Sequence, residues 1–145
     1  MIAGRRESAY AALFNKLNAI PGWVTTGRIV THWGKLAAVQ QPALFLAITK
    51  QTSLLTADNL PTRWKLEADV YVYVRNDSAN GTAPSTTLNA LLDLIDAALS
   101  PAPGFDRQTL SGIVEHCKIA GTIETDDGAL GDQAVAIIPV EMITS

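Results

Sequence analysis

Residues 63–75 read RWKLEADVYVYVR, and this stretch carries most of the information about the class of fold. Tryptophan and aliphatic side chains alternate with charged side chains and tyrosines, so a β-strand would place one of these two sets on each of its faces. A strand of this length is about 40 Å long at roughly 3.3 Å per residue. We therefore expect one end to project beyond the domain as part of a hairpin. One face would carry Trp64, Leu66, Ala68, Val70, Val72 and Val74.

A helix is predicted on each side of this strand in the chain. The first covers residues 5–19, where apolar side chains recur at spacings of three and four until Pro21 and Gly22 stop it. The second follows a polar loop at 76–84, with Ser85 or Thr86 as its N-cap, and ends at Ser100. The two apolar stripes are Tyr10, Leu13, Phe14, Leu17 and Ile20 in the first helix, and Leu88, Leu91, Leu92, Ile95 and Leu99 in the second.

Four further segments favour strands. Residues 24–33 alternate with mixed polarity, and residues 42–49 (PALFLAIT) form a short apolar run that indicates a central strand covered on both faces. Residues 113–125 and 133–143 are rich in β-branched side chains and are separated by Asp126-Asp127-Gly128, a pattern typical of a hairpin. Pro139 within the last segment predicts an edge position or a bulge.

The predicted order is therefore α-β-β-β-α-β-β. It indicates an α+β fold, a mostly antiparallel sheet with both helices packed on one face. The length of 145 residues suits one domain, residues 1–145, with an ordinary core.

Composition narrows the possible functions. The formal charge of -3 comes from scattered residues, and nothing in this pattern attracts nucleic acid strongly. One cysteine, Cys117, agrees with assembly in reducing cytoplasm. We expect no export signal from the N-terminal residues MIAGRRESAY, and no apolar run approaches the roughly 20 residues that span a bilayer. We expect a soluble protein with no membrane partner.

The motifs that carry common enzyme chemistry are missing from the sequence. Gly34-Lys35 lacks the glycine and hydroxyl residue that complete a phosphate-binding loop, and no G-x-S-x-G occurs. His116 and Cys117 are adjacent, but adjacent side chains on a strand point to opposite faces, so they make a poor base and nucleophile. We expect no catalytic residue and no enzymatic activity.

Metal, cofactor and DNA sites are also not expected. Two histidines and one cysteine, at no recognised spacing, fall short of a zinc site. Asp126 and Asp127 are interpreted as turn residues rather than paired carboxylates. Arg5 and Arg6 are interpreted as a solvated first helical turn rather than a contact with DNA or another anionic partner.

Interface residues are the remaining candidates. The loop at 50–61 (KQTSLLTADNLP) holds Leu54, Leu55 and Leu60 in a polar setting, and apolar loop residues either fold back on the domain or meet a partner. We expect these three leucines to meet a partner. Packing in the core and at subunit interfaces is also expected, ahead of base or sugar stacking, for Trp23, Trp33, Trp64, Tyr71 and Tyr73.

Several strings, in order along nearly the whole chain, resemble the tail-terminator proteins of long-tailed, non-contractile phages, the minor tail protein U type. The match consists of ordered fragments rather than one diagnostic motif. The fragments are AIPG at 19–22, HW at 32–33, QPALFL at 41–46, LP at 60–61 followed by Trp64, VYVY at 70–73, LNALLD at 88–93 and GDQA at 131–134.

The resemblance implies a small α/β subunit in a six-membered ring on the head-proximal end of the tail tube, in the virion. Such a ring ends tube polymerisation and presents a surface for head joining. The implied partners are further copies of the chain, the tail tube protein and a head completion protein, with DNA only passing through the lumen. A head-tail connector or another minor tail completion protein is the alternative, and a small hydrolase ranks last because the sequence lacks a catalytic set.

Overall fold

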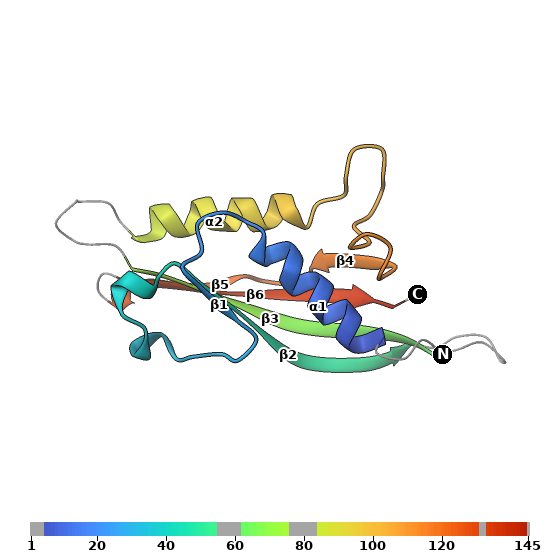
Figure 1. Cartoon of the computed structure of the whole chain (residues 1–145), viewed down its shortest axis with the longest axis horizontal. Helices are drawn as coiled ribbons and strands as arrows, with labels where there is room; N and C mark the ends of the chain where they lie inside the picture. Colours follow the sequence, from blue (N-terminus) through green and yellow to red (C-terminus); the bar gives the residue numbers. More distant parts are fainter. Residues whose placement is uncertain (1–4, 55–61, 76–83, 131–132, 145) are drawn as a thin grey trace.

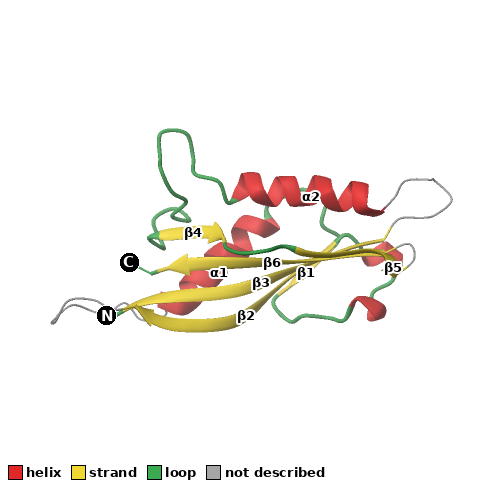
Figure 2. Ribbon diagram, turned by 180° about the vertical axis from the view of Figure 1, so that it is seen from behind, coloured by secondary structure: helices red, strands yellow, loops and turns green. Residues whose placement is uncertain are grey.

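The computed structural model describes residues 5–54, 62–75, 84–130 and 133–144 of the chain. It has two layers, a twisted six-stranded sheet and two helices that lie on one face of it (Figure 1). The strand order is β1-β2-β3-β6-β4 (Figure 2). β5 also pairs with β6, along the half of that strand that β4 leaves free. The predicted α+β class, with a mostly antiparallel sheet, is confirmed. The elements are α1 (Arg5–Asn18), β1 (Thr25–Gly27), β2 (Ala43–Leu54), β3 (Arg63–Arg75), α2 (Pro84–Ala98), β4 (His116–Ile119), β5 (Glu124–Leu130) and β6 (Gln133–Ile143).

β3 has the bounds predicted from its alternation, and it is the middle of the sheet. It pairs antiparallel with β2 on one side and with β6 on the other. Even its first residue is held on both sides, because Arg63 pairs with Leu54 and its Nε donates to the Thr144 carbonyl oxygen at 3.4 Å. Residues 65–73 of β3 have a paired strand on both sides, whereas residues 63–64 pair only with β2 and residues 74–75 only with β6. The expected projection of one end is therefore limited to two residues of β3.

β2 differs from the predicted central strand. Its first four residues, 43–46, are buried, as expected, but the strand continues to Leu54 and residues 48–53 are exposed. β1 pairs with β2 in parallel and only as far as Phe45, so the outer edge of β2 beyond that point has no strand beside it in the described part of the chain. The predicted strand at 24–33 is correspondingly reduced to Thr25–Gly27. The chain then passes through two short 3-10 turns, η1 (Trp33–Lys35) and η2 (Ala38–Gln40).

The C-terminal hairpin prediction is corrected in one respect. The segment expected as one strand is divided into β4 and β5, which pair with the two halves of β6. Asp126 and Asp127 lie inside β5, opposite Val135 and Ala134, and are not turn residues. The backbone of β6 supplies partners for them, and this tertiary pairing outweighs the weak strand preference of aspartate.

Pro139 lies in an interior strand, contrary to the expected edge. Its carbonyl oxygen accepts from the Ala120 amide at 3.0 Å. In an antiparallel sheet the N–H and C=O of one residue point to the same neighbour, so the proline nitrogen points away from β3. It faces the interruption between Ile119 and Glu124, where β4 has ended and β5 has not begun. The missing N–H therefore costs no ladder hydrogen bond to β3.

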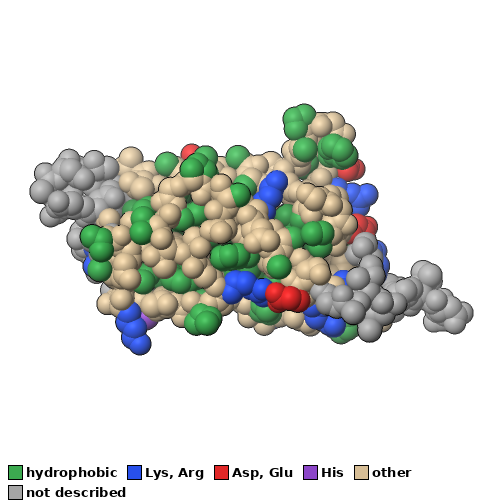
Figure 3. All heavy atoms as spheres, in the orientation of Figure 1, with side chains coloured by type: hydrophobic (Ala, Val, Ile, Leu, Met, Phe, Trp, Pro, Cys, Tyr) green, Lys and Arg blue, Asp and Glu red, His purple; other side chains and the backbone are tan. Residues whose placement is uncertain are grey.

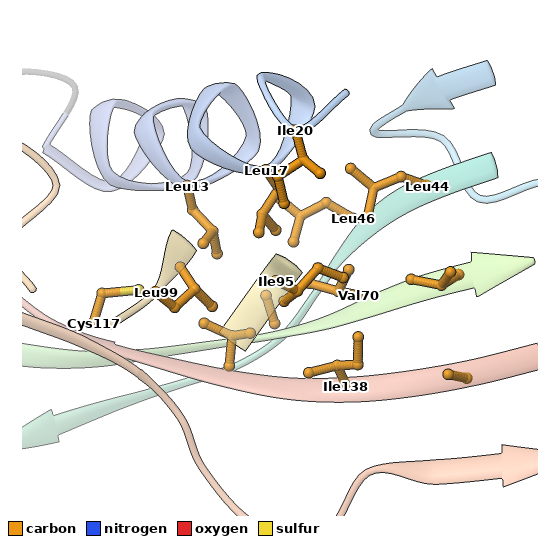
Figure 4. Close-up of a cluster of buried hydrophobic side chains, with 14 of the residues drawn as sticks. Leu13, Leu17, Ile20, Leu44, Leu46, Val70, Ile95, Leu99, Cys117 and Ile138 are labelled. Carbon is orange, nitrogen blue, oxygen red and sulfur yellow. The ribbon is translucent and has the colours of Figure 1, made fainter. Parts of the chain in front are cut away.

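The main core lies between the helices and the sheet. Figure 4 shows Leu13 and Leu17 of α1 turned toward Leu46 of β2, with Ile95 of α2 and Ile138 of β6 in the same cluster. Both predicted helices are confirmed, although α2 begins at Pro84, which places Ser85 and Thr86 inside its first turn rather than at the cap. A smaller cluster on the opposite face consists of Leu36, Ala43, Phe45 and Tyr73, with Tyr71 and Val135 against it.

Candidate interface surfaces

The sheet face turned away from the helices is largely uncovered, and we call it the open face. Beyond the small Leu36 cluster at one end, its side chains are half-buried or exposed. Apolar groups lie in its middle, where Tyr71 pairs with Ile137, and the pair is followed along β6 by Pro139, which lies opposite Asp69. Such a face is unusual for an isolated chain, because apolar side chains on a sheet are normally covered by a second layer.

Acidic side chains surround the apolar middle of the open face. Glu67 and Asp69 reach it from β3, and Glu124 and Asp126 reach it from β5, opposite Ile137 and Val135. We call these four residues the acidic patch. No ion pair joins any of them to a basic residue in the part of the chain that the structure describes.

Within the acidic patch, the surroundings of Asp69 disfavour its charged form. The pKa of the Asp69 carboxyl is raised above its ordinary 3.8, first by burial and then by the negative charges of Glu124 and Glu67. Glu67 also lies directly opposite Glu141 on β6, and like charges in directly opposed positions destabilise a sheet. Lys118 is opposite Glu141 on its other side, and Lys65 lies two residues before Glu67 on the same face of β3.

A second unusual surface is the connecting loop, residues 28–42, between β1 and β2. It carries Arg28 and Lys35 and no acidic residue. Two of its apolar side chains are strongly exposed, Ile29 at 86% and Val39 at 82%. Figure 3 shows Lys or Arg side chains and an Asp or Glu side chain along the lower edge of the molecule, on the side where this loop lies in Figure 1. Arg28 is paired with Glu7 of α1, whereas no ion pair holds Lys35 among the described residues.

The connecting loop is held in place despite its exposure. Leu36 is buried against Phe45 and Tyr73 on the chain's own sheet. The Gln41 side-chain amide donates to the Leu36 carbonyl oxygen at 3.3 Å, and the Ala37 amide donates to Gln40 Oε1 at 2.8 Å. The loop therefore presents Ile29 and Val39 on a supported backbone.

The three leucines predicted as a partner interface are only partly placed. Leu54 is half-buried at the end of β2, opposite Arg63. Leu55 and Leu60 lie outside the described residues. Their contact with a partner stays a prediction.

Arg5 and Arg6 are engaged within the chain rather than simply solvated. The Arg6 guanidinium carbon lies 4.5 Å from the centre of the Trp64 ring, and its Nε donates to Gln51 Oε1 at 2.7 Å. The Arg5 guanidinium donates to the Thr62 carbonyl oxygen at 3.2 Å. These contacts fasten the start of α1 to the β2–β3 pair and assign both arginines and Trp64 a structural role.

Of the other aromatic residues, Trp23 and Tyr73 pack within the chain, as expected, and the side chain of Trp33 lies outside the described part of the structure. Trp23 packs against the main core and its Nε1 donates to the Leu17 carbonyl oxygen at 3.0 Å. Tyr73 and Phe45 form a tilted aromatic pair with ring centres 5.7 Å apart. Tyr71 remains half-exposed on the open face.

His116 and Cys117 point to opposite faces of β4, as predicted. Cys117 is buried in the main core at 1% exposure, and this burial raises the pKa of its thiol to about 12. A thiol with that pKa stays protonated and unreactive at neutral pH.

Two pockets are lined by residues that the structure describes, and neither gathers groups for catalysis. These two shallow depressions beside α1, of about 250 and 320 Å³, contain Lys16 and Arg107 as their ionisable groups and no acid, histidine or cysteine. Within the described ranges no group of three His, Cys, Asp or Glu side chains is placed to hold a metal ion. No helix that the structure describes is both long and apolar enough to cross a membrane.

Sequence reasoning missed the acidic patch, although a signal for it was present. No acidic residue occurs between Glu7 and Asp58, whereas most of the acidic residues follow position 66. That asymmetry indicates separate positive and negative surfaces. The fold was needed to show that the acids of β3 and β5 share one face.

Comparison with known proteins gives a likeness in structure only. No family model matches the chain, and no curated protein matches it. Among solved structures, it is similar to a chain described as "Virion of native gene transfer agent (GTA) particle", with a TM-score of 0.59 and 11% sequence identity. The likeness covers 98% of each chain. At this identity it is a likeness of fold.

Proposed function

We propose that this chain is a non-enzymatic structural protein of a phage virion, which caps the head-proximal end of the tail tube. The observation that carries the proposal is the likeness of fold to a chain of a gene transfer agent virion over 98% of both chains. The ordered tail-terminator fragments in the sequence make the role more specific. In that role the chain ends tube polymerisation and provides the interface for head joining.

The physical requirements of a terminator suit the described surfaces. A closed six-membered ring needs two different surfaces on each subunit, because the contacts run head to tail. The connecting loop and the acidic patch are two such surfaces, and they differ in charge. The net charge of -3 also favours passage of DNA through the lumen without tight binding.

The proposed partners follow from this position. The tail tube protein would contact one rim of the ring and a head completion protein the other. Leu54, Leu55 and Leu60 are proposed for one of these contacts, because they are apolar residues in an otherwise polar stretch of sequence between two strands. Assembly would take place in the bacterial cytoplasm.

Disruption of the gene in the phage that carries it tests the role. Electron microscopy of the lysate should show headless tails of abnormal and variable length, because nothing then stops the addition of tube subunits. Expression of the intact gene in trans should restore joined particles with tails of one length. Tails of normal length beside unjoined heads would replace the terminator with a head-tail connector or another completion protein. Normal infectious particles would contradict both roles.

A further inference from the structure

We propose that copies of this chain join through one defined contact, in which the connecting loop of one copy lies on the acidic patch of the next. The inference rests on the proposed ring and specifies its subunit interface. Its occupant is a second copy of the chain, and the two surfaces that meet are residues 28–42 and the open face around Glu67, Asp69, Glu124 and Asp126.

The first argument is the distribution of charge. Residues 1–66 contain eight basic and two acidic residues, a net charge of +6. Residues 67–145 contain three basic and twelve acidic residues, a net charge of -9. The division falls inside β3, the middle of the sheet, so α1, β1 and β2 form a positive side and β5 and β6 a negative side. Two copies placed head to tail bring opposite charges together, which favours association in that orientation.

The second argument is that no ion pair joins the acidic patch to a basic residue in the described part of the chain. Glu67 faces Glu141 across the strands, and Asp69 is partly buried beside Glu124. A basic group from outside would relieve this repulsion. Lys35 of the connecting loop is exposed, and no ion pair holds it among the described residues. It is therefore available to a neighbour.

The third argument is that both surfaces also carry apolar groups. Ile29 and Val39 project from the connecting loop at 86% and 82% exposure. Tyr71, Ile137 and Pro139 lie half-buried in the middle of the open face. Burial of apolar groups between charged groups of opposite sign is the usual arrangement of a stable interface, with an apolar centre and a polar rim. Because the loop is already fixed by Leu36, little order has to be gained on binding.

The position of the loop also explains why the contact is between copies. Leu36 covers the chain's own open face only at the end near Tyr73 and Val135. The part around Asp69 and Pro139 stays open. A symmetric pair with open face against open face would place acid on acid, whereas a head-to-tail contact uses two different surfaces and can close into a ring.

Charge reversal in the purified chain tests the contact, with mass measured by analytical ultracentrifugation over a wide range of concentration. Lys35→Glu and Glu124→Lys should each raise the dissociation constant for self-association by at least about tenfold. The double variant, with both changes in one chain, should recover most of the loss because each interface again joins opposite charges. Both side chains are exposed, so the melting temperature should stay close to that of the unaltered chain.

Two matched controls make the same charge changes elsewhere. Lys16→Glu on α1 and Asp93→Lys on α2 alter exposed residues on the helix side and should leave self-association unchanged. The inference is overturned if the unaltered chain is a monomer throughout, if the controls weaken association as much as the interface variants do, or if the double variant fails to recover. Abnormal tails on gene disruption, together with rings insensitive to these reversals, would remove this inference and keep the proposed function. Normal infectious particles on gene disruption, together with self-association that these reversals weaken, would remove the proposed function alone.

Discussion

The ionisation of Asp69, on the open face, affects the stability of the isolated chain. Burial and the charges of Glu124 and Glu67 raise the pKa of its carboxyl in the folded state above the ordinary 3.8 that it has when the chain is unfolded. The folded protein then binds the proton more tightly than the unfolded chain does. The Asp69 contribution therefore favours folding at pH below 3.8 and is lost as the pH rises through the interval from 3.8 to the raised folded pKa.

Replacement of Asp69 by Asn should accordingly increase the free energy of unfolding at pH 7, because the amide resembles the protonated acid and carries no charge. The difference between the variant and the original protein should shrink as the pH approaches 4. Urea titration of the monomer at both pH values measures this. Asp93→Asn, on the exposed side of α2, is the control and should show little change. An Asp69→Asn variant that is less stable at pH 7 would contradict the assigned direction.

β6 shows how an element can tolerate a residue that its position alone would forbid. The strand has neighbours on both sides, yet Pro139 causes no loss because its nitrogen faces the interruption between β4 and β5. β5 illustrates the same dependence on neighbours. Its Asp126, Asp127 and Gly128 resemble a turn locally, and the backbone of β6 draws them into a strand.

Pro139→Ala should therefore change the free energy of unfolding by at most about 1 kcal/mol, chiefly through the greater freedom of the unfolded chain. Val70→Pro provides the contrast, because β3 has a strand on each side. That change should cost about 3 kcal/mol or more, since proline removes a hydrogen-bond donor from an enclosed strand. Chemical denaturation compares the two variants. A large decrease in the free energy of unfolding for Pro139→Ala would contradict this, because it would show that the pyrrolidine ring of Pro139 itself stabilises β6.

The whole molecule combines a positive side and a negative side in a chain of small net charge, and this arrangement favours association in one orientation. If opposite charges hold the copies together, salt should weaken the contact. Raising the ionic strength from 0.1 to 1 M shortens the screening length from about 10 Å to about 3 Å. The dissociation constant for self-association should then rise at least about tenfold, and light scattering across a salt series measures it. Association that strengthens with salt would indicate an apolar contact instead.

Local features were readable in the sequence because they depend on neighbours along the chain. The alternation in 63–75 predicted β3 with its observed bounds, and the three-and-four spacing of apolar residues predicted both helices and their buried stripes. The same periodicities predicted the α+β class, with both helices packed on one face of the sheet. His116 and Cys117 were also predicted to point apart, for the same geometric reason.

Features that depend on which strands lie side by side required the folded molecule. The sequence could not show that β4 and β5 share β6, that Pro139 faces a gap, or that the acids of β3 and β5 meet on one face. It also placed β2 in the centre of the sheet, because a short apolar run does not reveal that β1 covers only its first residues. Pairing between distant segments is a property of backbone hydrogen bonds across the sheet, and a local pattern contains no record of its partner.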